Sequence, residues 1–66
     1  MNITLNGKPH SLNQDSSVAD LVRSLGYEGK RIAVERNGDI VPKSRHAQTA
    51  LADDDVIEIV VAVGGG

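Results

Sequence analysis

The first residues of the chain alternate between apolar and polar side chains. Ile3 and Leu5 follow the period of a strand with one buried face. Asn6-Gly7 comes next and suits a type I′ turn, because both central residues of that turn need positive φ. Residues 8–12 therefore predict the return strand of a hairpin. Pro9 cannot donate a ladder hydrogen bond, so this strand is expected at a sheet edge.

An amphipathic helix is predicted at residues 17–25. Ser17 suits the N-cap, Asp20 completes a variant of the capping box, and Gly26 suits the C′ position. A helix this short depends on packing for its stability. The apolar positions fall at i, i+3, i+4 and i+7, on one face, and they are Val18, Leu21, Val22 and Leu25.

A second hairpin follows the helix. Residues 32–35 predict a third strand, and Asn37-Gly38 supplies another two-residue turn. Ile40-Val41 predicts a short fourth strand that ends at Pro42. Residues 43–50 are mixed and polar, which indicates a loop with a short helical turn.

The last apolar run, residues 56–63, is rich in β-branched side chains and predicts a central strand buried on much of both faces. We expect it beside the strand that precedes the helix. The element order predicts an α+β domain, with a mixed sheet of four to five strands and one main helix on one face. The predicted core is Ile3, Leu5, Val18, Leu21, Val22, Leu25, either Ile32 or Val34, Ile57, Ile59 and Val61.

Length and composition exclude several classes of protein. A chain of 66 residues forms one domain with little volume for an enclosed active site, which favours a carrier, a binding module or a subunit. Without cysteine there is no disulfide, no Cys-based metal site and no persulfide carrier. A net charge of −2 argues against nucleic acid as the main partner. No apolar run approaches the roughly 20 residues of a membrane span, so we expect a soluble, cytoplasmic protein.

Three glycines end the chain directly after its most regular strand. Gly64, Gly65 and Gly66 reach about 10 Å when extended, and without Cβ atoms they suit a narrow channel in a partner. The reactive group of such a thread is the α-carboxylate of Gly66. Adenylation by ATP followed by attack of a sulfur nucleophile converts it to a thiocarboxylate. A frayed chain end or an expression scar is the alternative interpretation.

Other polar residues have structural interpretations. The acidic triplet at 53–55 indicates a solvated turn rather than a metal site, because no complementary ligands are evident. His10 and His46 are isolated, which indicates structural or surface roles. Tyr27, the one aromatic residue, is expected to cover the end of the helix.

The order and spacing of these segments resemble the ThiS family of thiamine-biosynthesis sulfur carriers, which are small ubiquitin-like β-grasp proteins. The resemblance covers essentially the whole chain. Asp54 stands where such carriers often have Gly, and a third glycine follows the usual pair. The matching motifs are Ile3-x-Leu5-Asn6-Gly7, Val18-x-x-Leu21, Ile32-Ala33-Val34-Glu35, Ile40-Val41-Pro42, His46-Ala47, Leu51-x-Asp53-x-Asp55 and the final strand into Gly64-Gly65-Gly66.

The resemblance implies a carrier and not an enzyme. Gly66 would bear the sulfur, Gly64 and Gly65 would thread into the partners, and no cofactor would be bound. A ThiF-like enzyme would use ATP to adenylate the tail, a protein such as a cysteine desulfurase would donate sulfur, and a ThiG-like thiazole synthase would accept it. We expect a monomer when free, with a β-grasp domain at 1–63 and a flexible tail at 64–66.

A helix on one face leaves the other face of the sheet open for docking. Val56, Val60, Val63 and Ala33 are the candidates for this face, and core burial is the competing interpretation for the valines. Two other functions stay open. One is a sulfur carrier for molybdopterin, tRNA thiolation or cysteine synthesis, although molybdopterin carriers are longer and more aromatic. The other is a ubiquitin-like interaction module or a modifier conjugated to lysines.

Overall fold

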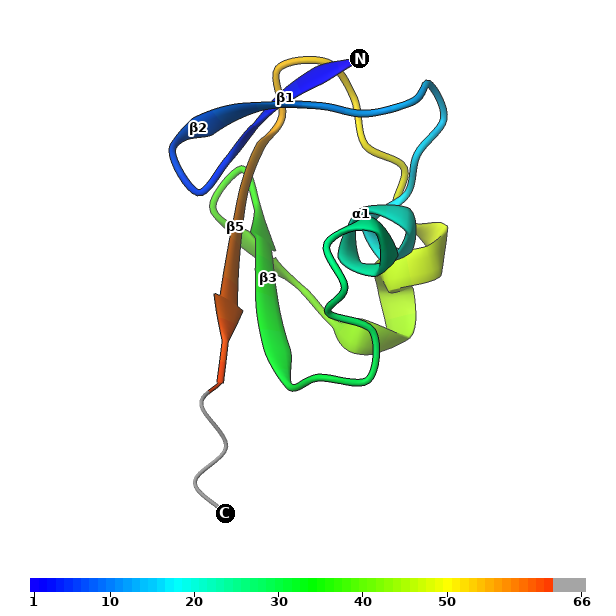
Figure 1. The fold of residues 1–66 in the computed structure, drawn as a ribbon, viewed down its shortest axis with the longest axis vertical. Helices are drawn as coiled ribbons and strands as arrows, with labels where there is room; N and C mark the ends of the chain where they lie inside the picture. Colours follow the sequence, from blue (N-terminus) through cyan, green and yellow to red (C-terminus); the bar gives the residue numbers. More distant parts are fainter. Residues whose placement is uncertain (63–66) are drawn as a thin grey trace.

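The computed structural model describes residues 1–62, in which one sheet of five strands is crossed on one face by a short helix (Figure 1). The strand order is β2-β1-β5-β3-β4. β5 runs parallel to β1 and antiparallel to β3, so the predicted mixed sheet is confirmed. The elements are β1 (Asn2–Leu5), β2 (Lys8–Ser11), α1 (Val18–Ser24), β3 (Ile32–Arg36), β4 (Asp39–Val41), the 3₁₀ helix η1 (Lys43–Gln48) and β5 (Val56–Val61).

Both predicted Asn-Gly turns are confirmed by their backbone angles. Asn6 and Gly7 have φ of 50° and 81°, and Asn37 and Gly38 have φ of 52° and 88°. Asparagine and glycine are the residues that adopt these left-handed angles most readily. Pro9 lies in the edge strand β2, opposite Thr4 of β1, as its missing N–H requires.

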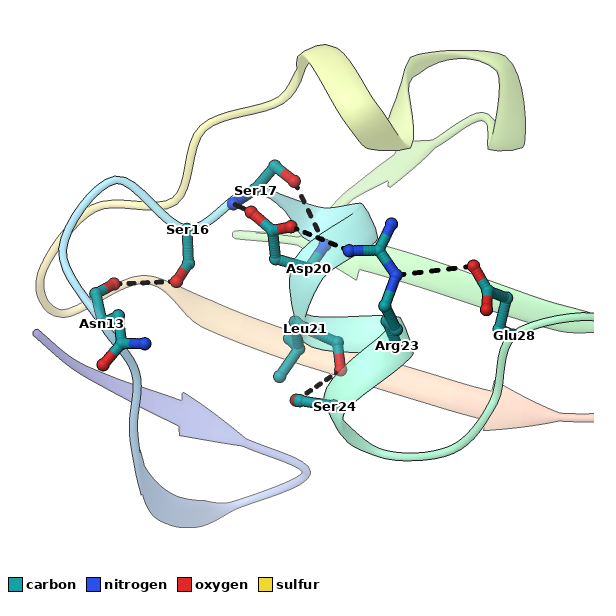
Figure 2. Close-up of polar contacts among 8 residues, drawn as sticks. All are labelled: Asn13, Ser16, Ser17, Asp20, Leu21, Arg23, Ser24 and Glu28. Atoms are coloured by element: carbon teal, nitrogen blue, oxygen red, sulfur yellow. Dashed lines mark hydrogen bonds and ion pairs between the residues drawn. The ribbon is translucent and has the colours of Figure 1, made fainter.

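The helix begins and ends at the predicted capping residues. The Ser17 hydroxyl accepts a hydrogen bond from the Asp20 backbone N–H at 3.1 Å, and the Asp20 carboxylate accepts one from the Ser17 N–H at 2.9 Å (Figure 2). This is the predicted capping box, with Asp in place of Glu. Gly26 follows the C-cap with φ of 77°, which ends the helix as expected.

β5 is central, but two predictions about it are wrong. Its neighbours are β1 and β3, whereas the strand directly before the helix, β2, lies at the edge. The strand is also not buried on both faces. Ile57 and Ile59 are buried, while Val56 and Val60 are 48% and 66% exposed. Within residues 1–62 the helix covers only one face, so the alternating valines remain in solvent.

The core lies between the helix and the covered face of the sheet. Val34 is the buried member of the predicted pair, while Ile32 is half-buried. Leu5, Leu25 and Val61 were predicted in the core but are only partly buried. Leu51 was not predicted in the core and is 6% exposed. Its backbone N–H donates to Ser16 O at 2.9 Å, and this hydrogen bond holds the segment around Leu51 against the core. The buried apolar residues are Ile3, Val18, Leu21, Val22, Val34, Leu51, Ile57 and Ile59.

Candidate functional site

The C-terminal end of β5 forms the base of the predicted tail. Val61 is in register with Ile32 of β3, and the backbone N–H of Ala62 donates to Arg31 O at 2.9 Å. β3 and the residue directly before it therefore hold the backbone as far as residue 62. The predicted sulfur-bearing Gly66 and the threading residues Gly64 and Gly65 lie outside the described residues, and the domain boundary at 63 stays a prediction.

Two turn asparagines clamp β5 from its two sides. The Asn6 side chain accepts a hydrogen bond from Ile59 N–H at 2.8 Å and donates one to Ile59 O at 3.2 Å. Asn37 accepts one from Val56 N–H at 2.8 Å through its side-chain oxygen, and its backbone N–H donates to Val56 O at 2.7 Å. These hydrogen bonds thus extend the pairing of β5 beyond the ends of the neighbouring strands β1 and β3.

The Asn-Gly pattern predicted only the turn conformation of these asparagines and not their hydrogen bonds to β5. The signal that could have found them is the choice of Asn itself. Its amide carries both a donor and an acceptor, as a backbone peptide group does, so it can continue a ladder where Gly or Asp cannot.

Asp55 contradicts the prediction that the whole acidic triplet is solvated, because it is only 6% exposed. Its carboxylate accepts hydrogen bonds from Asn37 Nδ2 at 3.0 Å, from the Ala52 N–H at 2.9 Å and from Arg36 Nε at 2.9 Å. Burial alone would raise the pKa of Asp55, but these three donors and the charge of Arg36 outweigh it, and the pKa is lowered. Asp55 is therefore an ionised anchor at the start of β5.

The other two members of the triplet, Asp53 and Asp54, are exposed as predicted. Asp54 has φ of 70°, a left-handed conformation that Gly adopts freely and Asp tolerates. Asp therefore fits at this position, where the resemblance described under Sequence analysis leads us to expect Gly. Within residues 1–62 no cluster of His, Asp and Glu is arranged to hold a metal ion.

The open face of the sheet carries an apolar surface. We define the sheet-face patch as Ala33, Ile40, Val56 and Val60, all of which are exposed. The competing prediction, that Val56 and Val60 are core residues, is wrong. Ile40 is 63% exposed and was missed, although its place opposite Glu35 follows from the two-residue turn between them. Val63, the remaining candidate, lies outside the described residues.

The two histidines and the tyrosine have structural positions. His46 is buried in η1, where its Nε2 lies 3.1 Å from Val41 O and acts as the donor, since a carbonyl oxygen can only accept. His10 is half-buried in β2. Tyr27 packs against the core after the end of α1, as predicted.

Among residues 1–62 no helix is long and apolar enough to cross a membrane.

A mixed five-stranded sheet of this order, with one helix across one face, defines a ubiquitin-like β-grasp domain. It has the fold of the crystal structure of the thiamine biosynthesis protein ThiS from Geobacter metallireducens, with a TM-score of 0.83, 30% identity and full coverage of both chains. The ThiS family model matches residues 3–66. The chain belongs to the ThiS family.

Curated relatives agree with this assignment. The chain is 45% identical to the sulfur carrier protein ThiS of Bacillus subtilis, over 97% of this chain and 98% of that protein. It is also 42% identical, along its whole length, to part of a protein named thiazole synthase in Paramagnetospirillum magneticum. The chain spans only 20% of the length of that thiazole synthase.

Proposed function

We propose that this ThiS-family chain is a sulfur carrier for thiazole formation in thiamine biosynthesis, with the C-terminal carboxylate of Gly66 as the sulfur-bearing group. The observation that carries the proposal is the extent of the family match. It runs from residue 3 to residue 66, so it includes the terminal glycines as well as the folded domain. The Bacillus subtilis relative, which matches over nearly its whole length, is named a sulfur carrier.

The chemistry needs no catalytic side chain from the carrier. A carboxylate oxygen of Gly66 attacks the α-phosphate of ATP, and pyrophosphate leaves. A sulfur nucleophile at the oxidation level of sulfide then attacks the carbonyl carbon of the acyl-adenylate, and AMP leaves. The product is a thiocarboxylate that a thiazole synthase uses as its sulfur source. The chain is thus a protein co-substrate, and ATP is consumed by a ThiF-like partner rather than bound here.

The relatives support a thiazole synthase as the sulfur acceptor. In two proteins named thiazole synthase, a segment similar to this whole chain makes up 20% of the polypeptide. Each of these proteins therefore joins a segment similar to this chain and the longer remainder of a thiazole synthase in one polypeptide. In this proposal a protein such as a cysteine desulfurase supplies the sulfur as a persulfide, and a thiol reductant releases it at the oxidation level of sulfide while a disulfide forms.

The sheet-face patch is the proposed docking surface for these enzymes. Its two valines bracket Glu58 on β5, and Ala33 lies directly opposite Val60 on β3. An exposed apolar surface of this kind favours a protein partner, and it adjoins the strand that leads to the tail. Replacing Val56 and Val60 together by Ala should weaken binding to the adenylating enzyme while the fold persists. Unchanged affinity in the double variant would reject this surface as the docking site.

Intact-protein mass tests the sulfur chemistry directly. The chain is incubated with a ThiF-like adenylating enzyme, ATP and a sulfide source. The expected mass gain equals the replacement of one oxygen by sulfur. A variant that ends at Gly64 should show no gain, and neither should the full chain without ATP.

The outcomes separate the candidate functions. A mass gain establishes carrier chemistry, and transfer of that sulfur by a thiazole synthase distinguishes thiazole formation from molybdopterin, tRNA or cysteine pathways. An isopeptide bond from Gly66 to a lysine would indicate a protein modifier. No change, with an enzyme that modifies another ThiS protein in parallel, would contradict the proposal and leave a β-grasp interaction module.

A further inference from the structure

A second surface lies on the helix side of the sheet, away from the sheet-face patch. An open cleft of about 560 Å³ is formed by α1, the loop at 26–31 and η1. Its lining includes the apolar side chains of Val22, Tyr27, Ile32 and Ala47. Lys30, Arg31 and Lys43 line the same cleft, and we refer to these three residues as the basic rim.

The basic rim has an uncompensated positive charge within the described residues. Arg23 and Glu28 also line the cleft, but their charges offset each other in an ion pair at 3.5 Å (Figure 2). The ion pairs found in residues 1–62 involve Arg23 and Arg36 and none of the rim residues. Lys30 Nζ lies 5.8 Å from the centre of the Tyr27 ring, so one cation of the rim lies over an aromatic residue of the lining.

The position of the basic rim relative to β5 indicates which kind of partner approaches it. Arg31 accepts the last described backbone hydrogen bond of the chain, from Ala62 at 2.9 Å. The loop at 26–31 lies at the same end of the molecule as the end of β5, and the acidic corner at 53–55 lies at the opposite end (Figure 1). A chain of net charge −2 thus has one residue of the basic rim, Arg31, directly beside Ala62, the last described residue. A protein that receives the tail must approach this end.

We infer that the cleft and its basic rim dock an acidic surface segment, carrying an apolar side chain, of the enzyme that adenylates the tail. Glutamate or aspartate of the partner lies against Lys30, Arg31 and Lys43, and the apolar side chain lies against Tyr27 and Ile32. This interaction rests on the proposed function but differs from the sheet-face patch, which is on the other face of the sheet and adjoins Glu35 and Glu58. Charge complementarity of this type acts mainly on the rate of association.

The test compares two variants with equal changes of charge. The rim variant is Lys30→Glu with Lys43→Glu. The control is Lys8→Glu with Asn13→Glu and Gln14→Glu, at exposed positions outside the cleft. Each lowers the net charge by four units. Association with a ThiF-like adenylating enzyme is followed by stopped flow at low and at high salt, and circular dichroism checks the fold of each variant.

The rim variant should associate about tenfold or more slowly than the unmodified chain at low salt, and the difference should shrink at high salt. The control should change much less. A third variant, Ala47→Trp, fills the cleft without changing its charge and should speed dissociation. Equal slowing of the rim variant and the control, or unchanged kinetics in the rim and Ala47 variants, would overturn the inference.

The mass assay separates this inference from the proposed function. If the unmodified chain gains sulfur, and the rim variant binds the enzyme as fast as the unmodified chain, the docking inference fails and the carrier function stands. If rim-dependent binding occurs but no sulfur is gained, the function fails and the docking surface stands. If the unmodified chain does not bind the enzyme at all, both are rejected.

Discussion

The two faces of β5 carry similar aliphatic side chains in opposite environments. Ile57 and Ile59 are buried beneath the helix, whereas Val56 and Val60 are in solvent one residue away. The difference shows that apolar composition does not by itself determine burial in a central strand. The covered face stabilises the domain, and the open face offers the surface that we propose for partners. Substitutions on the two faces should therefore have very different effects on stability.

The largest effect is expected on the covered face. Ile57→Ala should lower the free energy of unfolding by about 3 kcal/mol, because it leaves a cavity at a position with no exposed surface. For a small domain this is a large share of the total stability. Urea denaturation measures it, with Val56→Ala as the control on the other face. Equal losses in the two variants would contradict the assignment of the faces.

Asp55 precedes β5 on its covered side and should give the next largest effect. Asp55→Asn replaces a carboxylate that accepts three hydrogen bonds, and we expect a loss of about 2 kcal/mol at pH 7. The exposed Asp54→Asn is the control. A loss for Asp55→Asn no larger than that of the control would show that the carboxylate is not an anchor.

The same carboxylate predicts how stability depends on pH. The folded-state pKa of Asp55 is lowered, so its stabilising contribution is complete above the unfolded pKa of about 3.9. The contribution is lost as pH falls through the lower, folded-state pKa. Unfolding measured from pH 7 to pH 2 should show a decline below about pH 4 that is shallower in Asp55→Asn. An identical decline in both proteins would assign the acid sensitivity to other groups.

The asparagine clamps give a smaller effect. Asn6→Ala removes two hydrogen bonds to Ile59 and places alanine at a φ of 50°, so we expect a loss of about 1–2 kcal/mol. Asn6→Gly removes the same bonds but accepts the turn angle, and it should lose less. Amide hydrogen exchange at Ile59 should be faster in both. Unchanged exchange would mean that the clamp contributes nothing to the strand.

The smallest effect on stability is expected at Val60. Its side chain is 66% exposed, so Val60→Ala should change the free energy of unfolding by less than about 0.5 kcal/mol. The measurement is the same urea titration. A loss near that of Ile57→Ala would show that the open face is packed in solution and would remove the basis for a docking surface there.

Much of the candidate site followed from the sequence, and part of it did not. Val56, Val60 and Ala33 became candidates because they alternate with predicted core residues of their own strands, which is a local property, while core burial of the valines stayed open. Ile40 was missed, although the predicted Asn37-Gly38 turn sets the register that places it opposite Glu35. The basic rim was also missed, since its residues come from a loop and η1 and meet only at the cleft.

The sequence by itself determined the features set by neighbouring residues. These are the two Asn-Gly turns, the capping box of α1 and the strand periods, and each depends on φ preferences or hydrogen bonds within a few positions. Only the tertiary structure decided that the second face of β5 is uncovered, that Asp55 is buried and that Asn6 clamps the strand. Asn6 and Ile59 are 53 positions apart, and Arg36 and Asp55 are 19 apart. Contacts of that separation depend on how the whole chain folds, so a local pattern does not specify which residue the partner is.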